Sequence, residues 1–170
     1  MNRPLYDPYF THLPLLSAAM VIDATSRSSL PWLECGCGWY STMLMRRTAR
    51  AIGRQLVTLE AHQGWLDSFA DLRTDWHQLE FIQDWRQSDR WRQRWGVAFI
   101  DHYPPLMRGL VLRGLVGLAD LIVCHDADDP KAYDYGDFDG WTYRYEDRRL
   151  NPHTIILSNI HNVAVLCEES

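Results

Sequence analysis

Long apolar runs are absent from this sequence. No stretch approaches the roughly 20 apolar residues that a membrane-spanning helix needs, and the beginning lacks the pattern of a secretory signal. We therefore expect no membrane partner and a cytoplasmic location. Cysteine is also scarce, because four cysteines in 170 residues are too few for a disulfide framework. Cys35 and Cys37 have no second close pair, so we predict no zinc site on cysteine.

Positive charge is in deficit as well. The formal net charge is -5 at pH 7, whereas a nucleic-acid binder needs a concentrated basic face. The most basic segment, residues 86–94, contains Asp89 and follows Asp84, and its tryptophans are typical of a short anchored helix. We interpret its arginines as a solvated helix face and expect no nucleic-acid partner.

Internal repeats and low-complexity segments are missing too. The composition, 46% hydrophobic and 23% charged, is that of a globular chain, and 170 residues suffice for one hydrophobic core. We predict a single domain over residues 1–170. Within residues 1–30, the apolar spacing predicts a lid or packing helix at 13–26, and Pro31 marks a new beginning.

What the sequence does have is a regular alternation of apolar runs and helical stripes. The runs predict strands at 32–35, 55–59, 79–83, 97–100 and 120–124. The segments between them favour helices at 41–52, 64–76, 88–95 and 107–118. Strands that alternate with helices form a parallel sheet with helices on both faces.

The end of the chain departs from this alternation. Residues 154–157 and 163–166 are both β-like, and the connection between them is too short for a crossover helix. We expect these two runs to pair as an antiparallel hairpin. The predicted fold is α/β, a Rossmann-like doubly wound sheet of five parallel strands plus a C-terminal antiparallel hairpin.

Polar residues follow each of the five predicted parallel strands. They are Glu34 with Gly36 and Gly38, then Glu60, Asp84, Asp101 with His102, and His125 with Asp126. Because the carboxyl ends of parallel strands share one edge, these residues should line a ligand site near the switch point between the first and fourth strands.

The first turn and the second strand end indicate an adenosine-type ligand. Gly36 and Gly38 allow close approach of the backbone to a ligand, and the next helix begins with free N–H groups. Glu60 lies 22 positions after Gly38, near the ~20-residue spacing at which a carboxylate reaches a ribose. Ser41 stands where a dinucleotide-binding turn has its third glycine, which argues against a pyrophosphate ligand.

Four segments carry a resemblance to a known family. Residues 33–42, LECGCGWYST, and 56–61, LVTLEA, resemble the first two motifs of the class I S-adenosylmethionine-dependent methyltransferases. Residues 98–102, AFIDH, and 119–126, ADLIVCHD, are similar to the fourth- and fifth-strand motifs of small-molecule O-methyltransferases, including the catechol O-methyltransferase type. The resemblance spans residues 32–126, and more loosely the terminal hairpin.

The resemblance implies a cofactor, S-adenosylmethionine, and a set of residues that bind it. The implied set is Glu34, Gly36, Gly38, Tyr40, Ser41, Glu60, Ala61, Asp84, Trp85, Asp101 and His102. In that set, the turn around Gly36 frames the methionine part and Glu60 holds the ribose. Asp84 and Trp85 flank the adenine, while Asp101 and His102 lie beneath the sulfonium and ribose.

The implied activity is methyl transfer to a small-molecule acceptor, with oxygen as one candidate acceptor atom. Because the sulfonium is already activated, the protein must align the acceptor and remove its proton. We expect His125, Asp126 and Asp101 to form the catalytic set, with His125 as the base because of its pKa range. His102 is the second choice.

The metal ligands of related O-methyltransferases are incomplete here. Those that use magnesium or calcium bind the ion through two aspartates at these strand ends and a following asparagine. Asp101 and Asp126 match, but Ala127 replaces the asparagine and Pro104 stands where a catalytic lysine is expected. We therefore predict no metal site, although Asp128 or Asp129 is a candidate source of oxygen ligands.

Several alternatives stay open at this level. The same cofactor serves lyases and cyclases that break the sulfonium, and a noncatalytic binding protein can keep the fold. A nicotinamide-dependent oxidoreductase fits the glycines and Glu60 alone. The aromatic stretch 133–145 favours an acceptor-side loop, with a sheet-edge cover or a subunit interface as the other interpretations. The sequence does not determine the oligomeric state.

Overall fold

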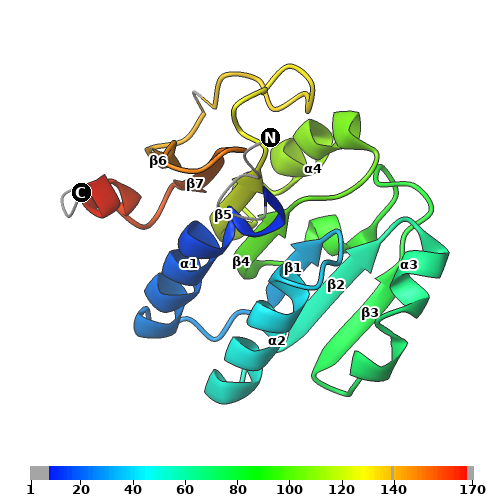
Figure 1. Cartoon of the computed structure of the whole chain (residues 1–170). Helices are drawn as coiled ribbons and strands as arrows, with labels where there is room; N and C mark the ends of the chain where they lie inside the picture. The colour runs from blue at the N-terminus through cyan, green and yellow to red at the C-terminus, as the bar shows by residue number, and fades with distance from the viewer. Residues whose placement is uncertain (1–7, 139, 168–170) are drawn as a thin grey trace, which may run out of the picture.

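A computed structural model describes residues 8–138 and 140–167 of the chain. Its centre is a seven-stranded sheet with the order β3-β2-β1-β4-β5-β7-β6 (Figure 1). The strands are β1 (Trp32–Cys35), β2 (Leu56–Glu60), β3 (His77–Phe81), β4 (Trp95–Ile100), β5 (Ala119–His125), β6 (Tyr143–Asp147) and β7 (Thr154–Ser158). The first five are parallel, and β7 pairs antiparallel with β5 and β6. The predicted fold is confirmed, with its switch point between β1 and β4.

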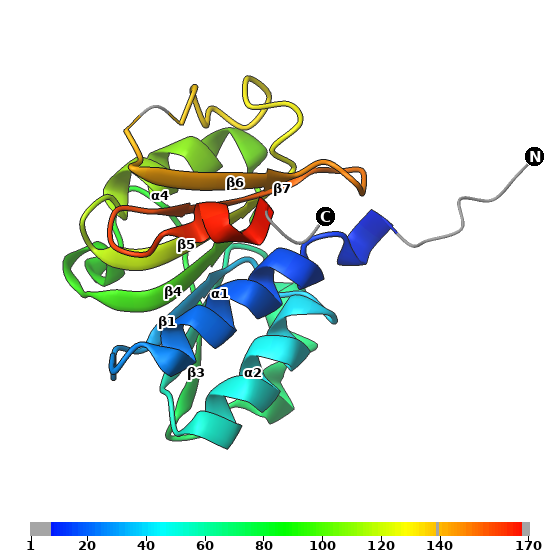
Figure 2. The same cartoon turned by 90° about the vertical axis from the view of Figure 1, so that its left-hand side faces the viewer.

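Helices cover both faces of this sheet, as Figure 2 shows. The α-helices are α1 (Leu13–Thr25), α2 (Ser41–Ile52), α3 (Gln63–Asp67) and α4 (Arg108–Gly114). α1 and α2 lie together on one face, and α4 packs on the other. Within the described ranges 8–138 and 140–167, no helix is both long and apolar enough to cross a membrane.

The strands place alternate side chains in two cores. Val97 and Phe99 of β4 are buried against the α1 and α2 side, whereas Ala98 and Ile100 are buried against the side of α4. This follows from the two-residue repeat of a strand whose faces are both covered. Buried positions throughout β1, β2, β4 and β5 explain why these strands read as continuous apolar runs.

Individual residues explain how the two long helices, α1 and α2, are held against the sheet. α2 has its apolar side chains Met45 and Ala49 buried against the sheet, and Gly53 ends it in the left-handed region at φ 71°. α1 is tied to the sheet by Asp23, which accepts a hydrogen bond from Trp32 Nε1 at 2.9 Å and pairs with Arg54 at 3.0 Å. α1 therefore packs against the domain along its length.

Three expected helices are shorter than the sequence predicted. The 64–76 stripe is divided into α3 and a 3-10 turn at Ala70–Leu72, and the 88–95 segment forms only the 3-10 turn Asp89–Arg92. The 107–118 helix contracts to a 3-10 turn, Pro105–Met107, and α4. Trp95 belongs to β4 instead, because its backbone pairs with the neighbouring strand β5.

The terminal hairpin forms, but with a different partner strand. We expected 154–157 to pair with 163–166, whereas β7 pairs with β6 and Val163–Cys167 is a 3-10 helix. Ser158 explains the exit of the chain from the sheet, because its Oγ accepts hydrogen bonds from the N–H groups of Ile160 and His161 at 3.1 and 2.8 Å. That turn directs Val163 into the core beneath β6 and β7.

Candidate functional site

The turn after β1 lies directly against the end of β4. Gly36 has φ 93°, and an added Cβ would lie 2.8 Å from the Cα of His102 and closer still to the carbonyl of Asp101. Glycine is therefore required at this position for both its conformation and its lack of a side chain. Two residues on, the Gly38 N–H donates to Thr42 Oγ1 at 2.9 Å, which fixes the turn on the start of α2.

Glu34 supports this turn from below. Its carboxylate accepts hydrogen bonds from Thr42 Oγ1 at 2.9 Å and from Thr58 Oγ1 at 2.8 Å, and its side chain is fully buried. Burial raises the pKa of Glu34 to about 7, against the opposing effect of its hydroxyl donors on Ser41, Thr58 and Thr42. Glu34 therefore positions the turn and lines none of the described pockets.

Glu60, at the end of β2, connects the first two strand-end turns. Its Oε2 accepts the N–H of Cys37 at 3.1 Å, and its Oε1 accepts the N–H of His62 at 2.7 Å. Only 5% of Glu60 is exposed, yet it reaches the wall of a pocket. Ala61, beside it, packs against the core on the α4 side of the sheet.

Two pockets open at this edge and share three residues, Cys37, Trp65 and Asp101. The first, about 430 Å³, is completed by Glu60, His62, His102, Tyr103 and Arg108. The second, about 350 Å³, is completed by Tyr9, His12, Gly38, Trp39, Tyr40 and Ser41. Each falls in the size range of small-molecule sites. The predicted residues from the ends of β1, β2 and β4 are therefore brought to one place.

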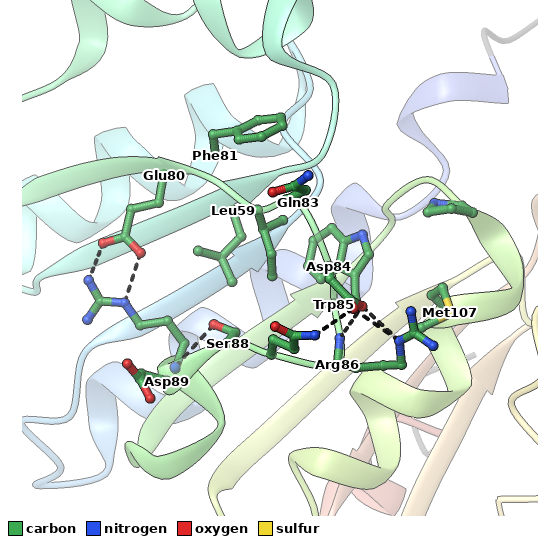
Figure 3. A pocket seen from close by; sticks show the side chains of 14 residues that line it. Leu59, Glu80, Phe81, Gln83, Asp84, Trp85, Arg86, Ser88, Asp89 and Met107 are labelled. Carbon is green, nitrogen blue, oxygen red and sulfur yellow. Dashed lines mark hydrogen bonds and ion pairs between the residues drawn. The ribbon is translucent and has the colours of Figure 1, made fainter.

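A third and larger pocket, about 870 Å³, lies at the end of β3 (Figure 3). Asp84 and Trp85 line it, as predicted residues that the structure places beside the first two pockets rather than in them. Asp84 forms an ion pair with Arg86 at 2.9 Å. The ring of Trp85 is buried and stacks on His102 with 3.7 Å between centroids, and burial lowers the pKa of His102 to about 3.

An arginine that the sequence analysis missed joins the catalytic candidates. Arg108 donates from Nη2 to Asp101 at 2.8 Å, from Nη1 to Asp126 at 2.7 Å and from Nε to the carbonyl of His102 at 2.8 Å. Burial opposes its charge, but Asp101 and Asp126 outweigh burial and raise the pKa of the guanidinium. The guanidinium also lies 4.6 Å from the ring centre of Tyr133.

The ion pair with Arg108 makes Asp126 a poor candidate for a magnesium ligand. The guanidinium already pairs with both aspartates that a magnesium-dependent O-methyltransferase would use, and Ala127 beside them is buried. Asp128 and Asp129 are exposed and accept hydrogen bonds from the backbone N–H groups of His153 and Ala132. Asp128 and Asp129 therefore stabilise backbone turns.

His125 lies between Asp101 and the segment that precedes α1. Its Nδ1 is 3.2 Å from Asp101 Oδ2, and its Nε2 is 2.9 Å from Thr11 Oγ1. Burial lowers the pKa of His125, but the hydrogen bond and charge of Asp101 outweigh this and raise it overall. The Asp101 carboxylate is therefore the charge partner that faces Nδ1, and Nε2 shares a hydrogen bond with the Thr11 hydroxyl.

The same segment carries His12, which the sequence gave no reason to single out. His12 packs 4.8 Å from the ring of Phe99 and 5.0 Å from the ring of His125, and it is 3% exposed. Burial lowers its pKa to about 4. Thr11, His12 and Arg108 are distant in sequence from the strand ends, so only the folded chain reveals their place in the site.

Comparisons with known proteins bear on the fold. No protein-family model matches the chain, and no curated protein matches it. Among solved structures, the SAH-bound Podospora anserina methyltransferase PaMTH1 matches with a TM-score of 0.64 at 14% identity, over 85% of this chain and 77% of that one. Human methyltransferase-like protein 13 in complex with SAH matches with a TM-score of 0.64 at 12% identity, over 96% and 89%.

A third solved structure agrees with these two. The N-terminal domain of human METTL16 in complex with SAH matches with a TM-score of 0.61 at 10% identity, over 95% of this chain and 76% of that one. The chain thus has the α/β fold of methyltransferases. At such identities the likeness extends to the fold alone.

Proposed function

We propose that this protein binds S-adenosylmethionine and transfers its methyl group to a small-molecule acceptor. The observation that carries the proposal is the place of Asp101. Its side chain lines both strand-end pockets and also contacts His125, so one residue joins the cofactor-sized space to the catalytic candidates. Bound in these pockets, S-adenosylmethionine supplies an activated methyl group on a sulfonium.

The residues around the β1 turn fit such a cofactor. Gly36 lets the turn pack against the end of β4, Gly38 and Ser41 line the second pocket, and Ser41 opens α2, whose first N–H groups suit a carboxylate. The Glu60 carboxylate at the pocket wall suits two ribose hydroxyls. Asp84 and Trp85 would flank the adenine, Trp85 through its contact with His102.

The catalytic step assigned to the protein is removal of the acceptor's proton. His125 is the base, held in orientation by Asp101, and the Thr11 hydroxyl on Nε2 relays the proton to it. Asp126 acts indirectly, because it pairs with the same guanidinium, that of Arg108, that pairs with Asp101. An oxygen acceptor fits this arrangement because its proton must leave as the methyl group arrives.

The ion pairs of the basic segment, residues 86–94, favour a small acceptor over a nucleic acid. Four of its arginines form ion pairs with carboxylates: Arg86 with Asp84, Arg90 with Glu80, Arg92 with Asp89, and Arg94 with Asp120. Such pairing leaves little net positive charge for phosphate contacts on this surface.

The proposal is tested by calorimetric titration with S-adenosylmethionine, SAH and NAD. We expect micromolar binding of both adenosyl ligands and none of NAD. Glu60→Gln should weaken SAH binding at least tenfold, because the ribose contact loses its charge. Glu146→Gln, which alters a carboxylate paired with His153 on the hairpin, is the matched control and should bind as the wild type does.

Product analysis then separates methyl transfer from the other reactions of this cofactor. Incubation of the protein with S-adenosylmethionine and a panel of small hydroxylated acceptors should yield SAH. Methylthioadenosine as the product would instead identify a lyase or cyclase. Tight binding with no product across the panel would identify a noncatalytic binding protein.

A further inference from the structure

His12 is a buried histidine without a partner. Among the residues that the structure describes, neither of its ring nitrogens has a hydrogen-bond partner, although 97% of the residue is shielded from solvent. A buried polar ring in this state needs an explanation, since most such groups in proteins are satisfied. The ring lies at the wall of the second pocket, beside Asp101.

Two further ligand-type side chains lie around this histidine. One donor atom from each of His12, Asp101 and His125 can be chosen so that all three lie within 4.8 Å of one another. Ligand atoms about 2.1 Å from a tetrahedral ion lie roughly 3.4 Å from each other, so the widest pair must close by at most about 1.4 Å. No other group of three or more potential metal ligands occurs in residues 8–138 and 140–167.

We propose that His12, Asp101 and His125 bind a divalent transition-metal ion. Two imidazoles and one carboxylate are the ligands of catalytic zinc and of non-haem iron sites, and they suit cobalt and nickel equally. They are not the all-oxygen set that magnesium and calcium prefer. This site is therefore distinct from the Asp101 and Asp126 pair considered from the sequence.

The surrounding charges permit such an ion. Arg108 contacts Asp101 through Oδ1, whereas His125 lies against Oδ2, so the second oxygen is the one directed toward the proposed site. Asp101 and Asp126 together carry two negative charges and Arg108 one positive charge, so the unliganded cluster keeps a net negative charge. The ion would add positive charge to this cluster between His125 and Asp101.

The position of the ligands leaves the ion accessible. His12 and Asp101 both line the second pocket, so an ion held by three protein ligands keeps an open coordination position on that side. Zinc-type ions lower the pKa of an oxygen bound at such a position. In the metal-loaded protein the ion would thus activate an acceptor hydroxyl, a role that His125 has in the metal-free protein.

The test is titration of the EDTA-dialysed full-length protein with Co²⁺, followed by optical absorption, and with Zn²⁺, followed by elemental analysis after removal of free metal. We expect one ion per chain, with the visible bands of nitrogen and oxygen ligands. His12→Phe should weaken binding at least about tenfold. His161→Phe, in the turn after β7, is the matched control and should bind as the wild type does.

Three results would overturn the proposal: no bound ion, equal affinity in His12→Phe, or a thiolate-to-cobalt band that identifies Cys37 as a ligand. If an ordered water instead forms the hydrogen bonds of the His12 ring, the titration will show no bound ion. The cobalt spectrum of the wild type needs no variant, so the test holds even if His12→Phe fails to fold. SAH titration of the same samples separates failure of the metal site from failure of the proposed function.

Discussion

Arg108 and Asp101 form a partly buried ion pair at the centre of the site, with 2.8 Å between Nη2 and Oδ1. The pair connects α4 to the end of β4, and the second nitrogen of the same guanidinium holds Asp126 after β5. Three elements at the carboxyl edge of the sheet therefore depend on one cation. The two pockets lie against the surface that this cation organises.

Arg108→Met should destabilise the protein by about 3–5 kcal/mol, because it leaves two partly buried carboxylates without a partner. Urea unfolding followed by circular dichroism measures this change. Arg113→Met is the control, since its pair with Asp134 is exposed on both sides and should contribute less than about 1 kcal/mol. Equal effects of the two substitutions would refute the assignment of Arg108 as the organising charge.

Gly36→Ala should prevent formation of the β1 turn and with it the binding of SAH. The added methyl group would overlap the backbone of Asp101 and His102, and alanine is strained at φ 93°. Gly53→Ala is a matched control, because Gly53 also has a positive φ, 71°, but an added Cβ there meets no atom within 4 Å. We expect a loss of about 1 kcal/mol with normal binding for Gly53→Ala; intact binding by Gly36→Ala would contradict the geometry.

Glu34 makes stability depend on pH. Its pKa is raised by burial from 4.5 to about 7, so its contribution to folding is fully present below pH 4.5 and is lost as the pH rises through 7. The difference corresponds to about 3 kcal/mol. Glu34→Gln has no such ionisation, and its stability relative to the wild type should increase by that amount between pH 4 and pH 8. Chemical denaturation at several pH values measures this, and a constant difference across the range would show that folding does not raise the pKa of Glu34.

His12→Phe should stabilise the metal-free protein by about 1 kcal/mol. The substitution keeps a ring against Phe99 and removes two buried nitrogens that have no partner among the described residues. Thermal unfolding in EDTA measures the change. With Zn²⁺ present the order should reverse, because only the wild type gains stability from the ion; a destabilised variant in EDTA would show that His12 has a structural partner.

Much of the fold follows from local patterns in the sequence. The helix at 41–52 was predicted with its observed bounds, because its apolar stripe is regular and Gly53 marks its end. Strands β1, β2, β4 and β5 follow from runs that are buried on both faces, whereas β3 has exposed positions. The hairpin partner was wrong, because the pairing of β6 with β7 depends on the turn at Ser158, which competes with the β-like character of 163–166.

The site was predictable where it depends on strand ends and not where it depends on long-range contacts. Gly36 and Asp101 come directly after strands and Glu60 ends one, so the topology alone places them together. Arg108 and His12 reach the site from α4 and from the segment before α1, and nothing in the local sequence indicates that these two polar residues are buried there. Glu34 is expected near the cofactor, and the structure places its buried side chain beneath the β1 turn.

Cofactor binding is measured by calorimetric titration of the wild type and of Glu60→Gln with SAH. We expect micromolar binding at one site per chain, weakened at least tenfold in Glu60→Gln and unchanged in Glu146→Gln. Absence of SAH binding to the folded wild type, or equal binding by Glu60→Gln, would refute the proposed cofactor site and leave only the fold established.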